Sequence, residues 1–248
     1  YVALPFSIPI VILIRLIKPI YHIHLGYFYG GRIGHFVSDT AMTAMSLDKE
    51  FKGAYLFYFL PNIANKQWAK MVKRELNVYY WVRLLAFANL LIPGGEKHSV
   101  IPGMSQEYTS RDLKGLIYHS DFEFKFTNNE IKFVKDWLHE KGWRDDDKII
   151  CVQVRDSQYL PTKNWAYHDY RNSDINTYIP AMELLVQKGY WVFRMGNTMK
   201  EPIKTLNSKI IDYPFDQHKD DLIDVWLFAN CDLCITTGSG PDAISTLY

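Results

Sequence analysis

Apolar residues occur along the chain in short blocks that alternate between the two-residue spacing of β-strands and the 3.6-residue spacing of α-helices. Glycine and proline separate many of these blocks, as turn residues do. Because strands and helices alternate, the pattern predicts an α/β fold with parallel sheets covered on both faces. Strands are predicted at 20–29, 54–60, 78–82, 149–154, 190–194, 209–212 and 234–237, and helices at 35–46, 66–76, 128–141, 174–188 and 220–229.

The alternation of strands and helices runs twice, and the two runs meet near residues 120–145. A chain of 248 residues accommodates one large domain or two small ones, at about 100–200 residues each. We therefore predict an apolar segment at 1–19, an α/β domain at 20–127 and a second α/β domain at 128–248. The chain starts without methionine and stops in what reads as the first turn of a helix, so we expect a piece of a longer protein with an incomplete second domain.

Composition and charge exclude some classes of protein and support the division. A chain that is 48% hydrophobic is not disordered, and a net charge of +1 argues against non-specific binding to nucleic acid. Lys and Arg outnumber Asp and Glu by 14 to 9 up to Thr127, and are outnumbered by 18 to 14 after it. Opposite signs suggest two units with different surroundings, although ordinary scatter is the alternative.

The first nineteen residues have the composition of a membrane-contacting segment. Residues 1–14 carry no charge, and Arg15 and Lys18 follow them. Fourteen helical residues reach about 21 Å, which is short of the roughly 30 Å apolar core of a bilayer. We therefore expect a helix in the interface of the cytoplasmic membrane, with Arg15 and Lys18 at the lipid headgroups. The alternative is an element packed on the body of the protein.

The three cysteines point to a reducing compartment. Cys151, Cys231 and Cys234 are too few for a disulfide framework, so we expect a cytoplasmic protein. Cys231 and Cys234 have the spacing of a zinc half-site or a redox pair, but no second Cys or His pair is nearby. We predict instead that they are small buried residues of a buried strand at 231–237.

A glycine turn follows the first predicted strand, where ligands of parallel α/β sheets bind. Gly31 and Gly34 let the backbone approach a ligand, and they flank Arg32 at the start of a helix. His35 is a candidate general base for an acceptor hydroxyl, and Asp39 is the second candidate. A tight turn with a capping histidine is the alternative.

The second half carries cationic and glycine-rich motifs at the ends of three predicted strands. Arg155 ends the first of these strands, and a guanidinium there can clamp a phosphate; an ion pair with Asp156 is the alternative. Small residues at the end of the last strand expose backbone N–H groups to an anion, without the lysine of a P-loop. Together these motifs suggest a nucleoside-diphosphate site formed by Arg155, Arg194, Gly196, Asn197, Thr237, Gly238, Ser239 and Gly240.

The loop after Arg155 is long for a connection between a strand and a helix, and it is rich in aromatic and polar residues. Such a set can hydrogen-bond a sugar and stack a ring on it. The candidate sugar contacts are Asp156, Tyr159, His168, Asp169, Tyr170, Arg171 and Asn172. Asp220, Asp221 and Asp224 start a helix and are interpreted as capping residues, so no metal site is predicted.

Taken together, these motifs resemble a family of bacterial glycosyltransferases associated with surface-polysaccharide gene clusters. The resemblance rests on V-R-D-S-x-Y at 154–159, H-D-Y-R-N-x-D-I at 168–175, G-Y-W-V-x-R-M-G at 189–196, T-G-S-G at 237–240 and G-R-I-G-H at 31–35. That family is similar in turn to enzymes of the GT-B fold. The resemblance implies two Rossmann-like domains facing across a cleft, the first binding the acceptor and the second the nucleotide-sugar donor. It also implies catalysis without a metal or other cofactor.

The expected activity is transfer of a sugar from a nucleoside-diphosphate-sugar donor to a glycan or lipid-linked acceptor, in bacterial surface polysaccharide synthesis. Arg155 would stabilise charge on the leaving diphosphate, and His35 or Asp39 would deprotonate the acceptor hydroxyl. A nucleotide-sugar epimerase on the same fold and a non-catalytic glycan-binding or scaffold subunit are the alternatives.

Overall fold

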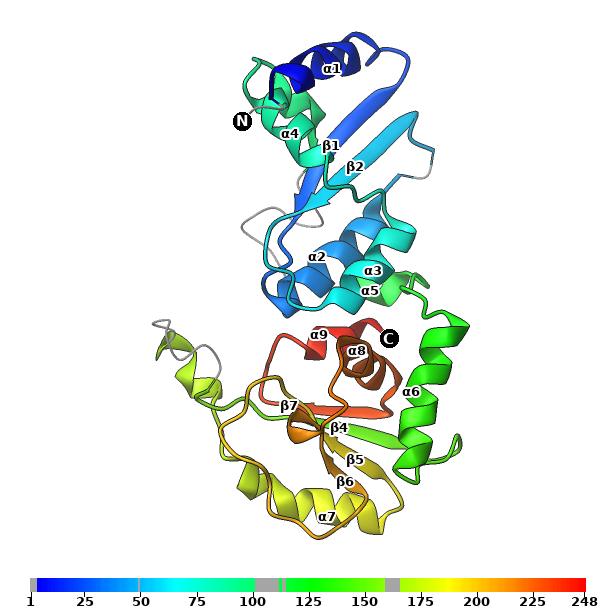
Figure 1. The fold of residues 1–248 in the computed structure, drawn as a ribbon, viewed down its shortest axis with the longest axis vertical. Helices are drawn as coiled ribbons and strands as arrows, with labels where there is room; N and C mark the ends of the chain where they lie inside the picture. Colours follow the sequence, from blue (N-terminus) through cyan, green and yellow to red (C-terminus); the bar gives the residue numbers. More distant parts are fainter. Residues whose placement is uncertain (1–3, 49, 101–111, 113–114, 159–165) are drawn as a thin grey trace. The chain divides into compact units, whose positions relative to one another are not determined.

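The computed structural model describes residues 4–48, 50–100, 112, 115–158 and 166–248. The chain divides into two compact units, Tyr1–Lys125 and Phe126–Tyr248, close to the division after residue 127 that the sequence suggests. Each unit contains its own parallel sheet flanked by helices (Figure 1). The predicted fold class, two α/β units of Rossmann type, is therefore confirmed.

In unit 1 the central strand is β1 (His22–Phe28), between β2 (Gly53–Phe59) and the two-residue strand β3 (Ser99–Val100). All three run parallel, and β1 pairs with β2 from His22 opposite Gly53 onward. Gly53 is required there, because a Cβ would lie 1.8 Å from the His22 carbonyl oxygen. The helical elements of the unit are α1 (Leu4–Leu16), α2 (Ile33–Ser46), α3 (Lys66–Glu75), α4 (Val82–Leu90), η1 (Gly95–His98) and α5 (Leu116–His119).

The strand predicted at 78–82 is wrong. Only Val78 forms a bridge, opposite Phe57, and the chain then turns into α4 at Val82. The pattern misleads because 78–82 is apolar and aromatic, like a strand, while its residues turn and join the apolar run of α4.

The predicted membrane segment forms α1, and one face of α1 packs on α4. Val11 and Ile14 are buried against Val82 and Leu85 in a shared apolar cluster. One face of the segment is therefore part of the core of unit 1, which was the alternative to membrane contact. Among the described residues, no helix has the length and apolar character needed to cross a bilayer.

Arg15 was predicted to lie at the lipid headgroups, but its guanidinium is hydrogen-bonded to the end of α4. Its Nη2 donates to the carbonyl oxygens of Asn89 at 2.8 Å and Ile92 at 2.9 Å, and its Nη1 donates to that of Pro93 at 2.6 Å. The last carbonyls of a helix have no partner within the helix and favour a cation. Arg15 therefore caps α4 and joins it to α1.

Arg15→Gln is expected to lower the free energy of unfolding of unit 1 by about 2 kcal/mol, since several charge-assisted hydrogen bonds are lost together. Guanidinium chloride unfolding, with hydrogen exchange of α1 and α4 to assign the change, measures it. Lys18→Gln removes a nearby cation that has no such bonds to α4 and serves as the control. Equal stability of the two variants would contradict the capping role.

In unit 2 the sheet has the order β6 (Ile210–Asp212), β5 (Trp191–Arg194), β4 (Ile149–Gln153), β7 (Leu233–Thr236), and all strands are parallel. The chain therefore builds outward from β4 to β6, then returns to place β7 on the other side of β4. The strand order reverses between β4 and β7, and this reversal is the topological switch point of a Rossmann-type sheet. The helical elements are α6 (Asn128–Glu140), η2 (Ala166–Arg171), η3 (Ile175–Tyr178), α7 (Ile179–Gln187), η4 (Tyr213–Phe215), α8 (Asp221–Asn230) and α9 (Asp242–Leu247).

Local chemistry explains where these helices begin. Thr127 and Glu130 form a reciprocal capping box at the start of α6. The Asp220 carboxylate accepts a hydrogen bond from Leu222 N at 2.7 Å, which confirms its predicted capping role. The helix predicted at 174–188 is interrupted: a 3-10 turn comes first, and α7 has Pro180 in its first turn, where its missing N–H costs nothing.

The strand at 231–237 is not buried as predicted, because β7 is the last strand on its side of the described sheet. Leu233 is 50% exposed, and Cys231 and Cys234 are half-buried. Only Cys151, on the inner strand β4, is fully buried among the three thiols, and its pKa is raised by that burial. An apolar run in the sequence does not distinguish an inner strand from an outer one.

Candidate functional site

The candidate site of unit 2 lies where β4 and β7 end side by side, at the switch point of the sheet. Thr237 N donates to Gln153 O at 3.2 Å, and Arg155 N donates to Thr237 Oγ1 at 3.0 Å. These bonds join the two strand ends that the sequence analysis had linked only by position. Ligands of open α/β sheets bind at such a reversal.

The loop after β7 is held by its own hydrogen bonds. Gly238, with φ of +77°, donates from its N to Thr236 Oγ1 at 3.0 Å, and Ser239 N donates to Asp242 Oδ2 at 3.0 Å. Two N–H groups that the sequence assigned to an anion are therefore already bonded. Burial raises the pKa of Asp242, whose carboxylate also accepts from the Thr236 hydroxyl at 2.9 Å. Asp242 was missed in the sequence, where it resembles any acid in the first turn of a helix.

Two arginines are hydrogen-bonded to the loop after β7, Arg155 through its main chain and Arg171 through its side chain. Arg155 is 8% exposed and lies two residues after the end of β4. Arg171, at the end of η2, donates from Nη1 to Gly238 O at 2.9 Å. The sequence assigned Arg171 to the sugar, but the structure brings it to the glycine-rich loop. The structure thus brings Arg155, Arg171 and the loop at 236–240 together at the switch point.

Arg194 ends β5 as predicted, yet its side chain is only 1% exposed. Its Nη1 donates to Asp212 Oδ1 at 3.1 Å and to Glu201 O at 2.8 Å. Its Nε and Nη2 are buried without a hydrogen-bond partner among the described residues. In this conformation Arg194 is hydrogen-bonded to the segment after β5 through Glu201 O. Its contact with a phosphate stays a prediction.

The neighbouring loops are tied together by polar bonds. Asp156 Oδ2 accepts from Lys200 N at 2.8 Å, and Gly196 and Asn197 lie in the turn after β5. Lys219 Nζ donates to Asn197 Oδ1 at 2.9 Å and also to its carbonyl oxygen. Burial lowers the pKa of Lys219. Sequence reasoning missed this cation, because its partner is 22 residues away and no local pattern marks the pair.

Gln153 is a second polar residue that the sequence analysis overlooked. It is the last residue of β4 and is 5% exposed, with Oε1 lacking a hydrogen-bond partner among the residues described. A buried polar group normally has a partner, so such an acceptor is a candidate ligand contact. One signal was present: Gln153 is the single polar side chain in the apolar run 149–154.

Residues 169–172 of the predicted sugar-binding loop contact one another. Asn172 Nδ2 donates to Asp169 Oδ1 at 3.0 Å, and Tyr170 is 82% exposed, with the Arg171 guanidinium 5.7 Å from its ring centroid. Tyr159 and the His168 side chain lie outside the described part of the chain. The described residues present an exposed aromatic ring beside the arginine that bonds Gly238.

In unit 1 the predicted glycine turn joins β1 to α2. Arg32 precedes the first residue of α2, Gly34 and His35 lie in its first turn, and Asp39 follows His35 by one turn on the same helix face. Burial and the nearby Arg32 guanidinium lower the pKa of His35. The imidazole is therefore neutral at pH 7 and able to accept a proton. Gly31 lies against the Tyr29 hydroxyl, where a Cβ would be only 3.1 Å from the oxygen.

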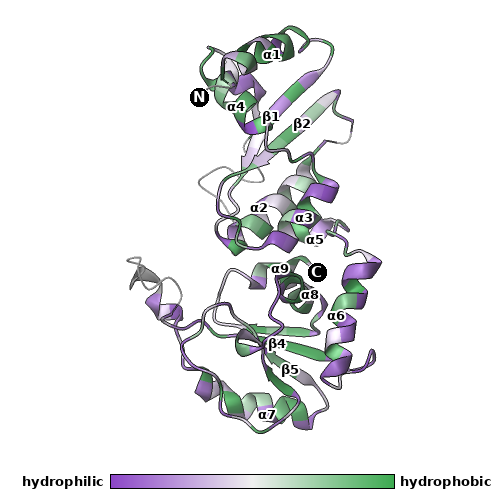
Figure 2. Cartoon of the chain, in the orientation of Figure 1, coloured by the Kyte–Doolittle hydropathy of each residue, from purple (hydrophilic) through white to green (hydrophobic). Residues whose placement is uncertain are grey.

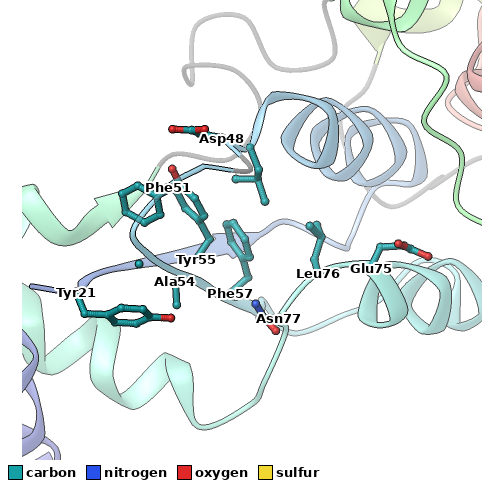
Figure 3. Close-up of a pocket in the computed structure, with 11 residues that line it drawn as sticks. Tyr21, Asp48, Phe51, Ala54, Tyr55, Phe57, Glu75, Leu76 and Asn77 are labelled. Carbon is teal, nitrogen blue, oxygen red and sulfur yellow. The ribbon is translucent and has the colours of Figure 1, made fainter.

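A hollow of about 250 Å³ opens elsewhere in unit 1, at the start of β2 (Figure 3). Phe51, Tyr55 and Phe57 are among its lining residues, together with the acids Asp48 and Glu75. None of the predicted site residues lines it, and it lies at the amino ends of the strands rather than the carboxyl ends. We therefore do not assign the candidate site to it.

No three His, Cys, Asp or Glu side chains converge on a position for a metal ion in the part of the chain that the structure describes.

No protein-family model matches the sequence, and no curated protein matches it. Among solved structures, the ADP-heptose LPS heptosyltransferase II of E. coli is similar to this chain, with a TM-score of 0.42 and 10% sequence identity. The alignment covers 91% of this chain and 82% of that one.

Proposed function

We propose that the protein is a metal-independent glycosyltransferase of the GT-B type. It would move a sugar from a nucleoside-diphosphate-sugar donor to a glycan or lipid-linked acceptor in the synthesis of a bacterial surface polysaccharide. Unit 2 would bind the donor and unit 1 the acceptor. The observation that supports this most is the convergence of Arg155, Arg171 and the loop at 236–240 on the switch point of the unit 2 sheet.

The donor diphosphate would be held by cations at this edge of the sheet. Arg155 would contact the leaving diphosphate and stabilise the charge that develops on it, as preorganised cations do in low-dielectric sites. Arg171 would act beside it, with Arg194 positioning the segment that includes Gly196 and Asn197. Asp242 would be protonated or displaced when the anion binds, because a buried carboxylate and a phosphate repel each other.

The acceptor hydroxyl would lose its proton to a residue of α2. His35 is neutral near pH 7 because burial and Arg32 lower its pKa, so the imidazole is in the form that accepts a proton. Asp39 is the second candidate, and it is 8% exposed.

The donor proposal is tested by nucleoside diphosphates. At a concentration one hundred times the Kd, the matching diphosphate should raise the free energy of unfolding by about 2.7 kcal/mol. Thermal unfolding with ADP, GDP, UDP, CDP and dTDP, against the nucleosides alone as controls, measures this. Absence of stabilisation by every diphosphate would contradict the proposal and favour a non-catalytic glycan-binding or scaffold subunit.

Product analysis distinguishes a nucleotide-sugar epimerase, the alternative activity, from a glycosyltransferase. A glycosyltransferase consumes its sugar nucleotide only with an acceptor or slowly by hydrolysis, whereas an epimerase converts it alone. Formation of an epimeric sugar nucleotide without acceptor would contradict the proposed transfer.

We also propose that the protein is cytoplasmic and contacts the cytoplasmic membrane peripherally through residues 1–19. A lipid-linked acceptor lies at that surface, and α1 exposes the apolar side chains of Phe6, Leu13 and Leu16.

A further inference from the structure

Two helices of unit 1 expose apolar side chains on neighbouring surfaces. α1 and α4 pack directly on each other, and both are strongly apolar (Figure 2). On α1, the side chains of Phe6, Leu13 and Leu16 are 76, 58 and 71% exposed. On α4, those of Leu84, Phe87 and Leu90 are 36, 48 and 69% exposed. We call these six side chains and the helix faces that carry them the two-helix surface.

The apolar face of α4 is not explained by its packing. Val82, Leu85 and Ala88 fill the core, and a helix on the surface of a protein normally places polar side chains opposite such a stripe. α4 places Leu84 and Phe87 there instead. Contiguous exposed apolar side chains of this kind mark a contact site.

The charged residues carried by α1 and α4 themselves have one sign, and the exposed Glu96 of η1, which packs on α4, is followed by the exposed Lys97. Residues 1–38 and 76–95 contain no Asp or Glu. Arg83 is exposed within α4, and Lys18 follows α1. An apolar surface whose two helices carry cations and no acids of their own is complementary to a bilayer that contains anionic lipid.

The aromatic residues before α4 fit the same partner. Tyr80 and Trp81 are 81 and 49% exposed at the start of the helix. Tyr and Trp are enriched at the headgroup level of membranes, where one end of the ring is apolar and the other polar. A second copy of the chain fits less well, because a symmetric contact would bring Arg83 and Lys18 toward like charges, and α1 and α4 carry no acid to pair with them.

We infer that α4 forms the second half of the membrane-contacting surface, so that α1 and α4 insert together into the headgroup region of an anionic bilayer. The inference rests on the proposed membrane contact of residues 1–19 and not on the proposed reaction. Deleting residues 1–18 would not test it, because Val11 and Ile14 belong to the core of unit 1.

The test is co-sedimentation of the full chain with vesicles of equal parts phosphatidylglycerol and phosphatidylcholine. Phe87→Ser/Leu90→Ser should weaken binding at least about tenfold, since two apolar side chains no longer enter the interface. Phe133→Ser/Leu206→Ser in unit 2 is the matched control, because Phe133 is 53% exposed and Leu206 fully exposed. Arg83→Gln should weaken binding on the order of fivefold on these vesicles and not on pure phosphatidylcholine.

The outcomes separate the inference from the proposals on which it rests. If Leu13→Ser/Leu16→Ser lowers binding and Phe87→Ser/Leu90→Ser does not, membrane contact stands and the role of α4 is overturned. If the wild-type chain does not bind anionic vesicles, both are overturned, while nucleoside-diphosphate stabilisation still tests the donor site. A lipid-free dimer that dissociates in Phe87→Ser/Leu90→Ser would assign the two-helix surface to a second copy and overturn the inference.

Discussion

Replacing Arg155 with glutamine is expected to abolish stabilisation by nucleoside diphosphates and to lower sugar transfer by about 10²–10³-fold. Arg155 follows β4 at the point where the strand order of unit 2 reverses, and its main-chain N–H is bonded to Thr237 of the loop at 236–240. When the bond between the anomeric carbon and the phosphate oxygen breaks, the diphosphate leaves with the electron pair, and a cation placed there stabilises the added negative charge. Thermal unfolding with the diphosphate and a transfer assay measure the two effects.

The fold should survive this change, because the main-chain hydrogen bonds of Arg155 to the residue after β7 and to the segment after η2 are kept. Its N donates to Thr237 Oγ1, and its O accepts from Ser173 N at 2.9 Å. Arg144→Gln removes the same charge from an exposed position of unit 2 and should leave nucleotide binding unchanged. Arg155→Lys should restore part of the binding, since the charge returns without the bidentate geometry. Nucleotide stabilisation of the wild-type size in Arg155→Gln would remove Arg155 from the donor site.

Most of the strands and helices could be predicted from the spacing of apolar residues. The strands at 149–154 and 190–194 and the helix at 128–141 differ from the observed elements by only one residue or so, because each block has its own spacing and an end signal such as Gly142. The two-residue strand β3 and the bridge at Val78 were missed or misread, since neither has enough residues to show a period.

Positions at strand ends indicated which residues lie close together, whereas pairs distant in sequence could not be predicted. Position after a strand brought Arg155 next to Thr237 without any knowledge of strand order. The partners of Arg15 and Lys219 lie 74 to 78 and 22 residues away, so no local pattern shows that these cations are engaged. An apolar helix face likewise has the same sequence pattern whether protein or lipid covers it, and α1 buries Val11 and Ile14 in unit 1 while it exposes Leu13 and Leu16.

Breaking the buried ion pair of Arg194 and Asp212 is expected to have a large effect on the stability of unit 2. The two residues are directly opposite in the parallel register of β5 and β6, and their side chains are 1 and 17% exposed. Arg194→Leu removes the cation and leaves the carboxylate buried, which is expected to destabilise unit 2 by about 3–5 kcal/mol. Burial already raises the pKa of Asp212, and the Ile203 N–H and Arg194 oppose that rise.

The loss should depend on pH in a defined direction. Without Arg194 the folded-state pKa of Asp212 rises further above its unfolded value, so the folded protein holds the proton more tightly. The stability of Arg194→Leu is then highest below the unfolded pKa and falls as pH rises toward neutral. Denaturant unfolding at pH 5 and pH 7 should therefore show the larger loss at pH 7. A variant as stable as the wild type at pH 7 would contradict a structural pair.

A double variant separates the structural role of Arg194 from direct contact with the donor. Arg194→Leu/Asp212→Leu removes both charges, and replacing a whole buried pair with apolar residues is often neutral for stability. We expect it to recover most of the lost free energy of unfolding and to keep its stabilisation by the matching nucleoside diphosphate. If stability returns but nucleotide stabilisation does not, the guanidinium turns toward the phosphate when the donor binds, and Arg194 belongs beside Arg155 in the donor site.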